Sequence, residues 1–355
     1  MEYLFDDVLE IKNGKNQKAV ENPTGQYPIY GSGGVMGYAD DYICDADTVI
    51  IGRKGSINNP IYVAEPFWNV DTAFGLSAKK EYLLPRYLFY FCKKFDFEKL
   101  NKTVTIPSLT KSDLLKIKID LPSKEEQQNV VNKLTKIEKV IDFRRQELSA
   151  LDDLIKARFV ELFGTLDNPA QEFEKATLKE LCNKITDGKH GGCTSEEGTK
   201  RYFVGAREIY DDEVHYDTAP EINVDEFEKD YKRCNIEIGD FLIVNTGATI
   251  GKSAIASDER TEHTLLQKSV ALLKVKQELL NPMFLKWCYR VNTRMYMVES
   301  ASAQPNLLLS KINATEIYVP DMKLQNQFAD FVKQVDKSKV VCVFGRLACT
   351  QIKRV

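Results

Sequence analysis

Apolar residues recur in steps of three and four between Ser123 and Phe163, and polar residues of both charges fill the positions between them. No Pro or Gly interrupts this pattern before Gly164. A sustained seven-residue period predicts one long helix with an apolar seam, as in a coiled coil, and an ordinary long core helix is the alternative. The predicted seam residues are Val130, Leu134, Ile137, Ile141, Leu148, Leu151, Ile155 and Leu162.

The chain before this helix and the chain after it show the same features in the same order. Each block has a short apolar run that leads into a polar turn with glycine, at residues 47–57 and at residues 239–252. Each then has an amphipathic segment led by Pro85 or Pro282, and proline fits the first turn of a helix. The recurrence indicates two related globular domains.

The ends of the two blocks correspond as well. Ile106–Leu109 and Gln304–Leu307 share a proline followed two residues later by leucine, and the same separation along the chain pairs Gln127 with Gln325. We interpret this as a duplication with a period of roughly 200 residues, in which a globular domain precedes a long helix twice.

The second long helix is expected to begin after Pro320. Its predicted seam residues are Phe328, Val332 and Val335. Beyond Val335 the apolar period fails, and the β-branched residues of 340–345 favour a strand over a helix. We therefore expect the second helix to be shortened or atypical at its end.

Two long helices of one chain can lie antiparallel and bury each other's seams. The predicted fold class is α+β, with two duplicated globular domains separated by long helices that pack as an antiparallel coiled coil. A rod of roughly 60 Å suits two separated sites on a long ligand, and duplex DNA has a turn of about 34 Å. The expected boundaries are 1–122 for the first domain, 123–164 for the first helix, 165–320 for the second domain and 321–355 for the second helix.

Composition narrows the class of protein. The 355 residues are 43% apolar and 28% charged, which is typical of a soluble globular protein. The net charge is -3, so any binding of nucleic acid must come from local basic patches. The chain start lacks the pattern of a signal peptide and no apolar run is long enough for a membrane span, so we expect a cytoplasmic protein without membrane contact.

Catalytic, nucleotide and metal sites are not predicted. Gly247–Ser253 resembles a phosphate-binding loop but has three residues between its glycines where that loop needs four. Residues 31–34 are expected to form a surface loop, since no helix follows as a dinucleotide site requires. Cys182, His190 and Cys193 lack the paired spacing of a structural zinc site, so Cys182 is expected in a core.

Several segments of the two blocks occur in a distinctive order: Ile51–Ile57, Pro66–Thr72, Ile106–Leu109, Leu121–Gln127, Leu151–Phe159, Thr246–Lys252 and Val319–Gln325. In their order and duplication, these segments are similar to the specificity subunit of type I restriction–modification systems. The resemblance covers about residues 4 to 336 and departs from the family over Val340–Val355, where such subunits usually continue an amphipathic helix.

The resemblance implies a subunit without chemistry of its own. Each globular domain would be a target recognition domain that reads one half of a bipartite, asymmetric site in double-stranded DNA. The helices would act as a ruler for the unread spacer and dock two methyltransferase subunits, which methylate adenine N6, and restriction subunits would complete an ATP-dependent nuclease. S-adenosylmethionine, ATP and magnesium are therefore expected on the partner subunits, and no cofactor on this chain.

Basic, amide and hydroxyl side chains in the polar turns are the candidate DNA contacts. Arg and Lys can pair with guanine, and Asn and Gln with adenine, at about 1–3 kcal/mol of discrimination for each good bidentate pair. The candidates are Lys12, Lys15, Asn16, Lys18, Arg53, Lys54 and Ser56 in the first block, and Lys189, His190, Lys200, Arg201, Arg207, Thr246, Lys252 and Lys268 in the second. The two glycine turns rank highest because they recur at equivalent places.

Other classes of function stay open at this point. The net negative charge also suits a two-module coiled-coil scaffold for protein interaction with no nucleic-acid role. An enzyme built on the glycine turn at 247–253 would bind ATP by itself. A short second helix would allow the chain to associate with another copy of itself.

Overall fold

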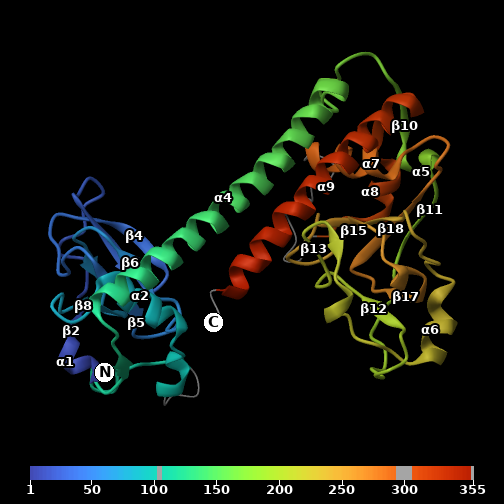
Figure 1. The fold of residues 1–355 in the computed structure, drawn as a ribbon. Coiled ribbons are helices and arrows are strands. Elements are labelled where there is room, and N and C mark those ends of the chain that lie inside the picture. The colour runs from blue at the N-terminus through green and yellow to red at the C-terminus, as the bar shows by residue number, and fades with distance from the viewer. Residues whose placement is uncertain (102–105, 293–305, 353–355) are drawn as a thin grey trace. The chain divides into compact units, whose positions relative to one another are not determined.

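The computed structural model describes residues 1–101, 106–292 and 306–352, and for residues 340–352 it describes the backbone only. Its contacts divide the chain into two compact units. The first consists of residues 1–144 and the chain end from Phe344, and the second consists of residues 145–343. Figure 1 labels many of the helices and strands of both units.

Two larger sheets lie in the described part of the first unit. Their strands are β2 (Leu9–Asn13), β3 (Tyr27–Gly31), β4 (Gly34–Ala39), β5 (Thr48–Gly52), β6 (Ile61–Val63), β7 (Trp68–Asn69) and β8 (Ala73–Ala78). Four of them form an antiparallel sheet in the order β2-β8-β5-β6, and the others form a smaller sheet in the order β4-β3-β7. Strand β5 is buried along its whole length, as expected for the apolar run after Asp47.

Short elements complete the first unit. They are β1 (Glu2–Leu4), α1 (Phe5–Val8), α2 (Pro85–Lys94), the 3-10 helix η1 (Phe97–Leu100), α3 (Lys111–Leu114) and β9 (Lys118–Asp120). Strands β1 and β9 pair antiparallel and bring the two ends of the domain together. Helix α2 begins at Pro85 as predicted, and its residues Leu88 and Phe89 enter the same core as Val49 and Ile51 of β5.

The second unit repeats this design. Its strands are β10 (Glu174–Thr177), β11 (Cys182–Asp187), β12 (Tyr202–Val204), β13 (Ile209–Tyr210), β14 (Glu213–Val214), β15 (Phe241–Val244), β16 (Ser253–Ile255), β17 (Thr264–Leu266), β18 (Val270–Val275) and β19 (Glu316–Val319). Its short helices are α5 (Leu178–Leu181), η2 (Tyr216–Thr218), α6 (Val224–Tyr231), η3 (Glu259–His263), α7 (Pro282–Val291) and α8 (Leu309–Ala314).

The duplication predicted from the sequence is confirmed by the topology. The sheet β11-β18-β15-β16 has the strand order of β2-β8-β5-β6, and β10 pairs with β19 as β1 pairs with β9. Helix α7 corresponds to α2, and each begins with a proline. The domains differ in what is inserted between shared elements, since the first has the hairpin β3–β4 where the second has α6 and the short hairpin β13–β14.

Each domain is followed by a long helix, α4 (Lys124–Phe163) and α9 (Met322–Ile352). Ser123 starts α4 because its hydroxyl accepts a hydrogen bond from the Glu126 N–H at 3.2 Å while the Glu126 carboxylate accepts one from the Ser123 N–H at 3.0 Å. Gly164, with φ of 71°, ends the helix in the left-handed conformation. The predicted bounds of the first helix are therefore confirmed.

The prediction for residues 340–345 is wrong. The structure continues α9 as a helix through these residues to Ile352, so they do not form a strand. Valine in a helix costs only a few tenths of a kcal/mol, about 0.7 kcal/mol at most, relative to alanine. Such a small preference for strand does not end a helix whose backbone hydrogen bonds are already in place.

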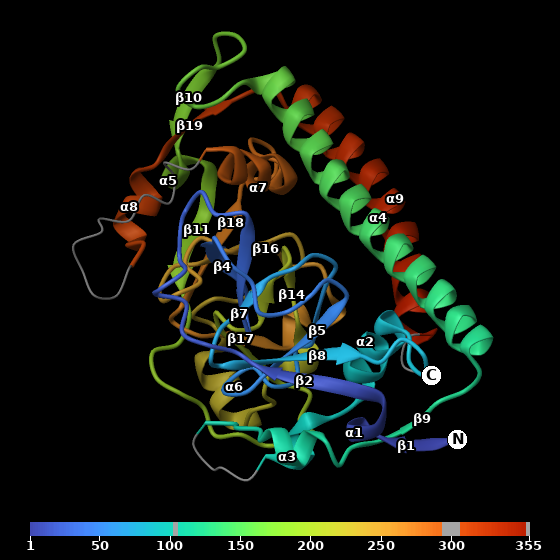
Figure 2. The ribbon, with the colours of Figure 1, turned by 90° about the vertical axis from the view of Figure 1, so that its left-hand side faces the viewer.

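Within the second unit, α4 and α9 pack antiparallel (Figures 1 and 2). The Phe159 and Phe163 rings contact Phe328, with centroids 5.3 Å and 5.6 Å apart. Further along α9, the Lys339 Nζ pairs with Asp152 of the preceding turns of α4 at 2.8 Å. The two helices therefore run in opposite directions, as the predicted antiparallel coiled coil requires.

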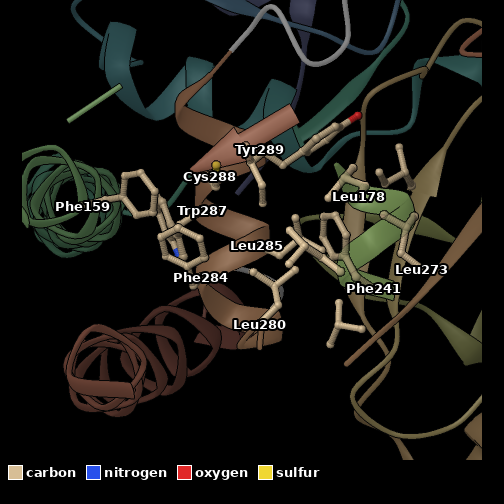
Figure 3. Close-up of a cluster of buried hydrophobic side chains, with 14 of the residues drawn as sticks. Phe159, Leu178, Phe241, Leu273, Leu280, Phe284, Leu285, Trp287, Cys288 and Tyr289 are labelled. Carbon is tan, nitrogen blue, oxygen red and sulfur yellow. The ribbon is translucent and has the colours of Figure 1, made fainter. Parts of the chain in front are cut away.

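The predicted seam is correct for most positions in this part of the helices. Ile155, Phe328, Val332 and Val335 are buried, and Leu148, Leu151 and Leu162 are half-buried. The largest buried side chains of α4, however, are Phe159 and Phe163, which the seven-residue pattern did not include. Figure 3 shows Phe159 against Phe284 of α7, so α4 also packs on the globular core of the second domain.

The seam prediction is less accurate at the start of α4. Ile141 is buried and Leu134 and Ile137 are half-buried, but Val130 is exposed and Val131 is buried in its place. Val131 belongs to the hydrophobic core of the first domain. A single apolar seam does not describe α4, because its two ends pack against different partners.

In the described residues, none of the helices combines the length and the apolar character needed to cross a membrane.

Candidate nucleic-acid interface

The glycine turn of the first domain is held at the end of strand β5 by backbone hydrogen bonds. The Arg53 N–H donates to the Thr72 carbonyl at 2.7 Å, and the Arg53 carbonyl accepts from the Leu109 N–H at 2.9 Å. Gly55 has φ of 78° and donates its N–H to the Pro107 carbonyl at 3.0 Å. With the backbone fixed on both sides, the side chains of Arg53, Lys54 and Ser56 are left exposed.

The glycine turn of the second domain has the same backbone frame. The Asn245 N–H donates to the Ser269 carbonyl at 3.0 Å, and the Asn245 carbonyl accepts from the Leu307 N–H at 2.7 Å. Thr246 forms a β-bridge with Asn306, as Lys54 does with Ser108. Arg53 and Lys54 thus occupy the positions of Asn245 and Thr246, so the equivalence predicted for the two turns is confirmed, but the side chains differ.

Two further loops of the first domain lie next to its glycine turn. The Lys15 N–H donates to the Asn69 carbonyl at 2.9 Å, three residues before Thr72, which holds the glycine turn. Residues 31–34 form the turn of the hairpin β3–β4, and a Cβ added to Gly52 would lie 3.1 Å from the Cβ of Ser32. Lys15 and the hairpin turn therefore lie near the exposed side chains of residues 53–56, and we call Lys15, Ser32, Arg53, Lys54 and Ser56 the first candidate face.

The remaining candidates of the first domain are placed less favourably. Lys12 extends from β2 to Asp45, 2.7 Å from its carboxylate, and this hydrogen bond raises the pKa of the lysine. Asn16 accepts a hydrogen bond from the Lys18 N–H at 2.9 Å, which shapes their loop and leaves both residues exposed. Asp45 therefore neutralises the charge of Lys12, whereas Lys18 is exposed in its loop.

Several candidates of the second domain support the fold. Lys189 pairs with Asp230 at 2.7 Å and with Glu226 at 3.3 Å, and these carboxylates raise the pKa of its ammonium group. His190 lies 3.6 Å from Asp187, and Arg201 lies over the Phe227 ring with 5.1 Å to its centroid. By contrast Lys200, Arg207, Lys252 and Lys268 are exposed, and Lys268 is next to Ser269, which holds the glycine turn.

Residues 247–253 are not arranged to surround a phosphate with backbone N–H groups. The N–H groups of Ile250, Gly251 and Lys252 donate to the carbonyls of Gly247, Val244 and Thr249. Strand β16 follows the turn, where a phosphate-binding loop would lead into a helix. The turn therefore lacks the local structure of a nucleotide site.

Among the side chains that the structure describes, no three His, Cys, Asp or Glu residues come close enough to hold a metal ion. Cys182 is buried in the second core, as predicted, and burial raises the pKa of its thiol to about 12. The Cys182 thiol is therefore protonated at neutral pH, and the residue contributes to the packing of the core.

Two residues of this region were not found from the sequence alone. Asn306 is exposed, and its amide oxygen accepts a hydrogen bond from the Thr246 hydroxyl at 3.2 Å. Its match with Ser108 in the repeat was the available signal. Arg290 of α7 lies beside Lys252 in an open pocket, and nothing in the pattern of α7 distinguishes it from other basic residues at a helix end.

Comparison with known proteins places these features in a family. The family described as type I restriction modification DNA specificity domain matches residues 2–152 and again residues 170–341. A putative type I specificity subunit of Mycoplasma pneumoniae is 26% identical over 187 residues, which are 50% of this chain. The matched region spans 61% of the length of that relative.

Two solved structures are similar in fold. The crystal structure of the type I restriction-modification S subunit from M. genitalium has a TM-score of 0.60 at 18% identity, over 99% of this chain and 93% of that one. A chain from a structure described by complex assembly and conformational transition of the type I R-M system has a TM-score of 0.56 at 16% identity, over 100% of this chain and 95% of that one.

Proposed function

Because the chain belongs to the family of type I restriction-modification DNA specificity domains, we propose that it is the sequence-recognition subunit of a type I methyltransferase and restriction complex. Each globular domain reads one half of a bipartite, asymmetric site in double-stranded DNA. The chain carries out no chemistry, and S-adenosylmethionine, ATP and magnesium bind to its partner subunits.

One observation carries this proposal. The two glycine turns share a backbone frame but differ in their side chains: Arg53 and Lys54 are exposed in the first domain, whereas in the second Asn245 is buried and Thr246 is half-buried. Hydrogen-bonding groups of different type on one scaffold are suited to different base pairs, since arginine and lysine match guanine whereas a threonine hydroxyl can pair with more than one base. Two such turns in one chain favour two unlike half-sites.

The long helices supply the spacer and the docking surface in this proposal. On the part of α4 that belongs to the first unit, Val140 and Phe143 are exposed, and Phe143 has an exposed fraction of 66%. Their spacing of three residues places them on one side of the helix, away from the buried residue Ile141. An apolar stripe of this kind supports docking of methyltransferase subunits, with restriction subunits joining the assembly through them.

The test is a map of N6-methyladenine in DNA from cells that express this chain with its cognate methyltransferase subunit. One asymmetric, interrupted motif is expected, with unrelated halves. A palindromic interrupted motif would instead mean that one domain reads DNA in a dimer, which light scattering would detect. A complex that forms and shows no sequence preference would overturn the proposal.

A further inference from the structure

Two basic side chains of the second domain pair with one carboxylate, and a third lines the same pocket. Lys286 and Arg290 lie one turn apart on α7, and both pair with the same oxygen of Asp212, the Lys286 Nζ at 3.5 Å. Asp212 sits in the turn between β13 and β14, with φ of 63°. Lys252 joins them across an open pocket of about 360 Å³, which Asp212, Arg290 and residues 250–253 line.

Two basic side chains share the carboxylate of Asp212 at this pocket. Asp212 is the carboxylate paired with Lys286 and Arg290, so one negative charge faces two positive ones, and Lys252 adds a third. The Asp336 carboxylate also interacts electrostatically with Lys286, but it forms an ion pair with the Lys339 Nζ at 2.9 Å. The Lys286 side chain is 13% exposed, and charge held away from water favours a further anion nearby.

The pocket adjoins the turn that the repeat marks as a candidate for DNA contact. Lys252 closes the glycine turn that begins at Thr246, the equivalent of Lys54 in the first domain. DNA presents a row of phosphates beside the bases, and more than half of protein–DNA hydrogen bonds go to the backbone. A phosphate in this pocket would set the position of the turn over its bases.

We propose that this pocket binds one backbone phosphate of the DNA, with Lys252 and Arg290 as its ligands and Lys286 as the supporting charge. Asp212 is the competing anion, which holds Arg290 in place when DNA is absent. This inference rests on the proposed function and adds a positioning contact to it, distinct from the residues that read bases.

Free nucleotides contain the same phosphate chemistry, but the site is better suited to a single phosphodiester. Among the residues that line the pocket, the N–H groups of Ile250, Gly251 and Lys252 are bonded to the carbonyls of Gly247, Val244 and Thr249, so these three groups are not available to the anion. A triphosphate is normally held by a row of free backbone N–H groups, which this turn does not offer.

The test measures how the DNA affinity of the complex between this chain and its methyltransferase subunit changes with salt concentration. The DNA contains the motif that the map of N6-methyladenine identifies. Lys252→Gln is expected to make the slope of log affinity against log salt shallower by about 0.9, the value for one lost phosphate contact. The loss of affinity is expected to be equal for the motif and for single-base variants of it. Asp212→Asn removes the competing anion, so its effect on affinity is expected to be opposite, and this variant should bind DNA several-fold more tightly.

Lys229→Gln is the matched control, since Lys229 is an exposed lysine of the same domain on α6. An unchanged slope for Lys252→Gln, or the same change in both lysine variants, would overturn the inference. A loss confined to one base position would also overturn it, because Lys252 would then be a base contact.

Two further measurements separate the remaining outcomes. Calorimetry of the full chain with pyrophosphate and with ATP is expected to show no binding, and tight binding that Lys252→Gln abolishes would assign the pocket to free nucleotides instead. If the unmodified complex shows no sequence preference, the proposed function fails. If it shows the preference and only the salt slopes disagree, the phosphate site alone fails.

Discussion

The side-chain oxygen of Gln127 accepts a hydrogen bond from the backbone N–H of Leu84 at 2.9 Å, although the two residues lie 43 positions apart. The amide nitrogen of Gln127 donates to the carbonyls of Tyr82 and Pro122. In this way the first turn of α4 is tied to the start of α2, whose first residue follows Leu84.

The second domain repeats this arrangement with different neighbours. The Gln325 side chain accepts from the Asn281 N–H at 2.8 Å and donates to the carbonyls of Leu279 and Pro320. Both glutamines are fully buried. Each long helix is therefore fixed to its own domain by a buried amide.

Replacing either glutamine should destabilise its domain. In Gln127→Ala, the Leu84 N–H and two carbonyls lose their partner in a buried place, which is expected to cost about 2–4 kcal/mol, since each unsatisfied buried group costs about 1–3 kcal/mol. Urea unfolding of the full chain measures this free energy. Gln128→Ala is the control, because Gln128 is exposed on the same helix and its change should stay within about 0.5 kcal/mol. Equal effects of the two variants would contradict the role of the buried amide.

The packing of α4 in the second unit depends on Phe159. Its ring contacts Phe163, Phe284 and Phe328 and is fully buried, so Phe159→Ala is expected to cost about 3–5 kcal/mol of unfolding free energy. The next residue, Val160, is partly exposed, and Val160→Ala should change stability by less than about 0.5 kcal/mol. Denaturant titration compares the two, and a mild effect of Phe159→Ala would mean that α4 does not contribute to this core.

The exposed stripe of α4 should be needed for assembly and not for folding. Phe143→Ser removes an exposed apolar side chain, so the thermal midpoint of the isolated chain is expected to stay unchanged while the amount of methyltransferase subunit that co-purifies falls. Ile238→Ser is a suitable control, because Ile238 is similarly exposed but lies outside the helices. Full recovery of the complex with Phe143→Ser would place the docking surface elsewhere.

The first candidate face should determine one half of the motif. Arg53→Gln is expected to relax or change base preference at one position of one half-site, with about 1–3 kcal/mol of discrimination lost there, and to leave the other half unchanged. Sequencing of methylated DNA detects the change. Lys99→Gln, on the 3-10 helix η1, is the matched control for loss of a positive charge in the same domain. A change in both halves, or in neither, would show that Arg53 is not a base contact of one domain.

Asp47 should make the first domain sensitive to acid. Hydrogen bonds from Tyr62 at 2.5 Å and from Lys80 at 2.9 Å lower the pKa of its carboxyl below the ordinary 3.8. A lowered pKa in the folded state gives stability that is present above pH 3.8 and is lost as the pH falls through the folded value. Asp47→Asn keeps the left-handed backbone at this position, since asparagine tolerates it.

The urea midpoints of the unmodified chain and of the Asp47→Asn variant are measured at pH 7 and at pH 3. The variant is expected to be less stable than the unmodified chain at pH 7, and the difference should shrink at pH 3. A difference that is the same at both values would mean that the charge of Asp47 does not contribute.

The periodic and repeated features were determined by the sequence alone. The bounds of α4, the proline starts of α2 and α7, the two glycine turns and the duplication all depend on signals within a few residues or on copies of one pattern. Such signals are local because they arise from backbone conformation, capping and periodicity. For this reason they could be read without knowing which segments meet.

Only the tertiary structure decided which side chains meet across the chain. A helix pattern does not show that the two ends of α4 face different cores, so it favoured Val130 over Val131 and missed Phe159. Nor does it show that Asp230 neutralises Lys189, or that Asp212 gathers Lys286 and Arg290 next to Lys252. These relations join residues far apart in the sequence, where burial and charge outweigh the weak preferences of single residues.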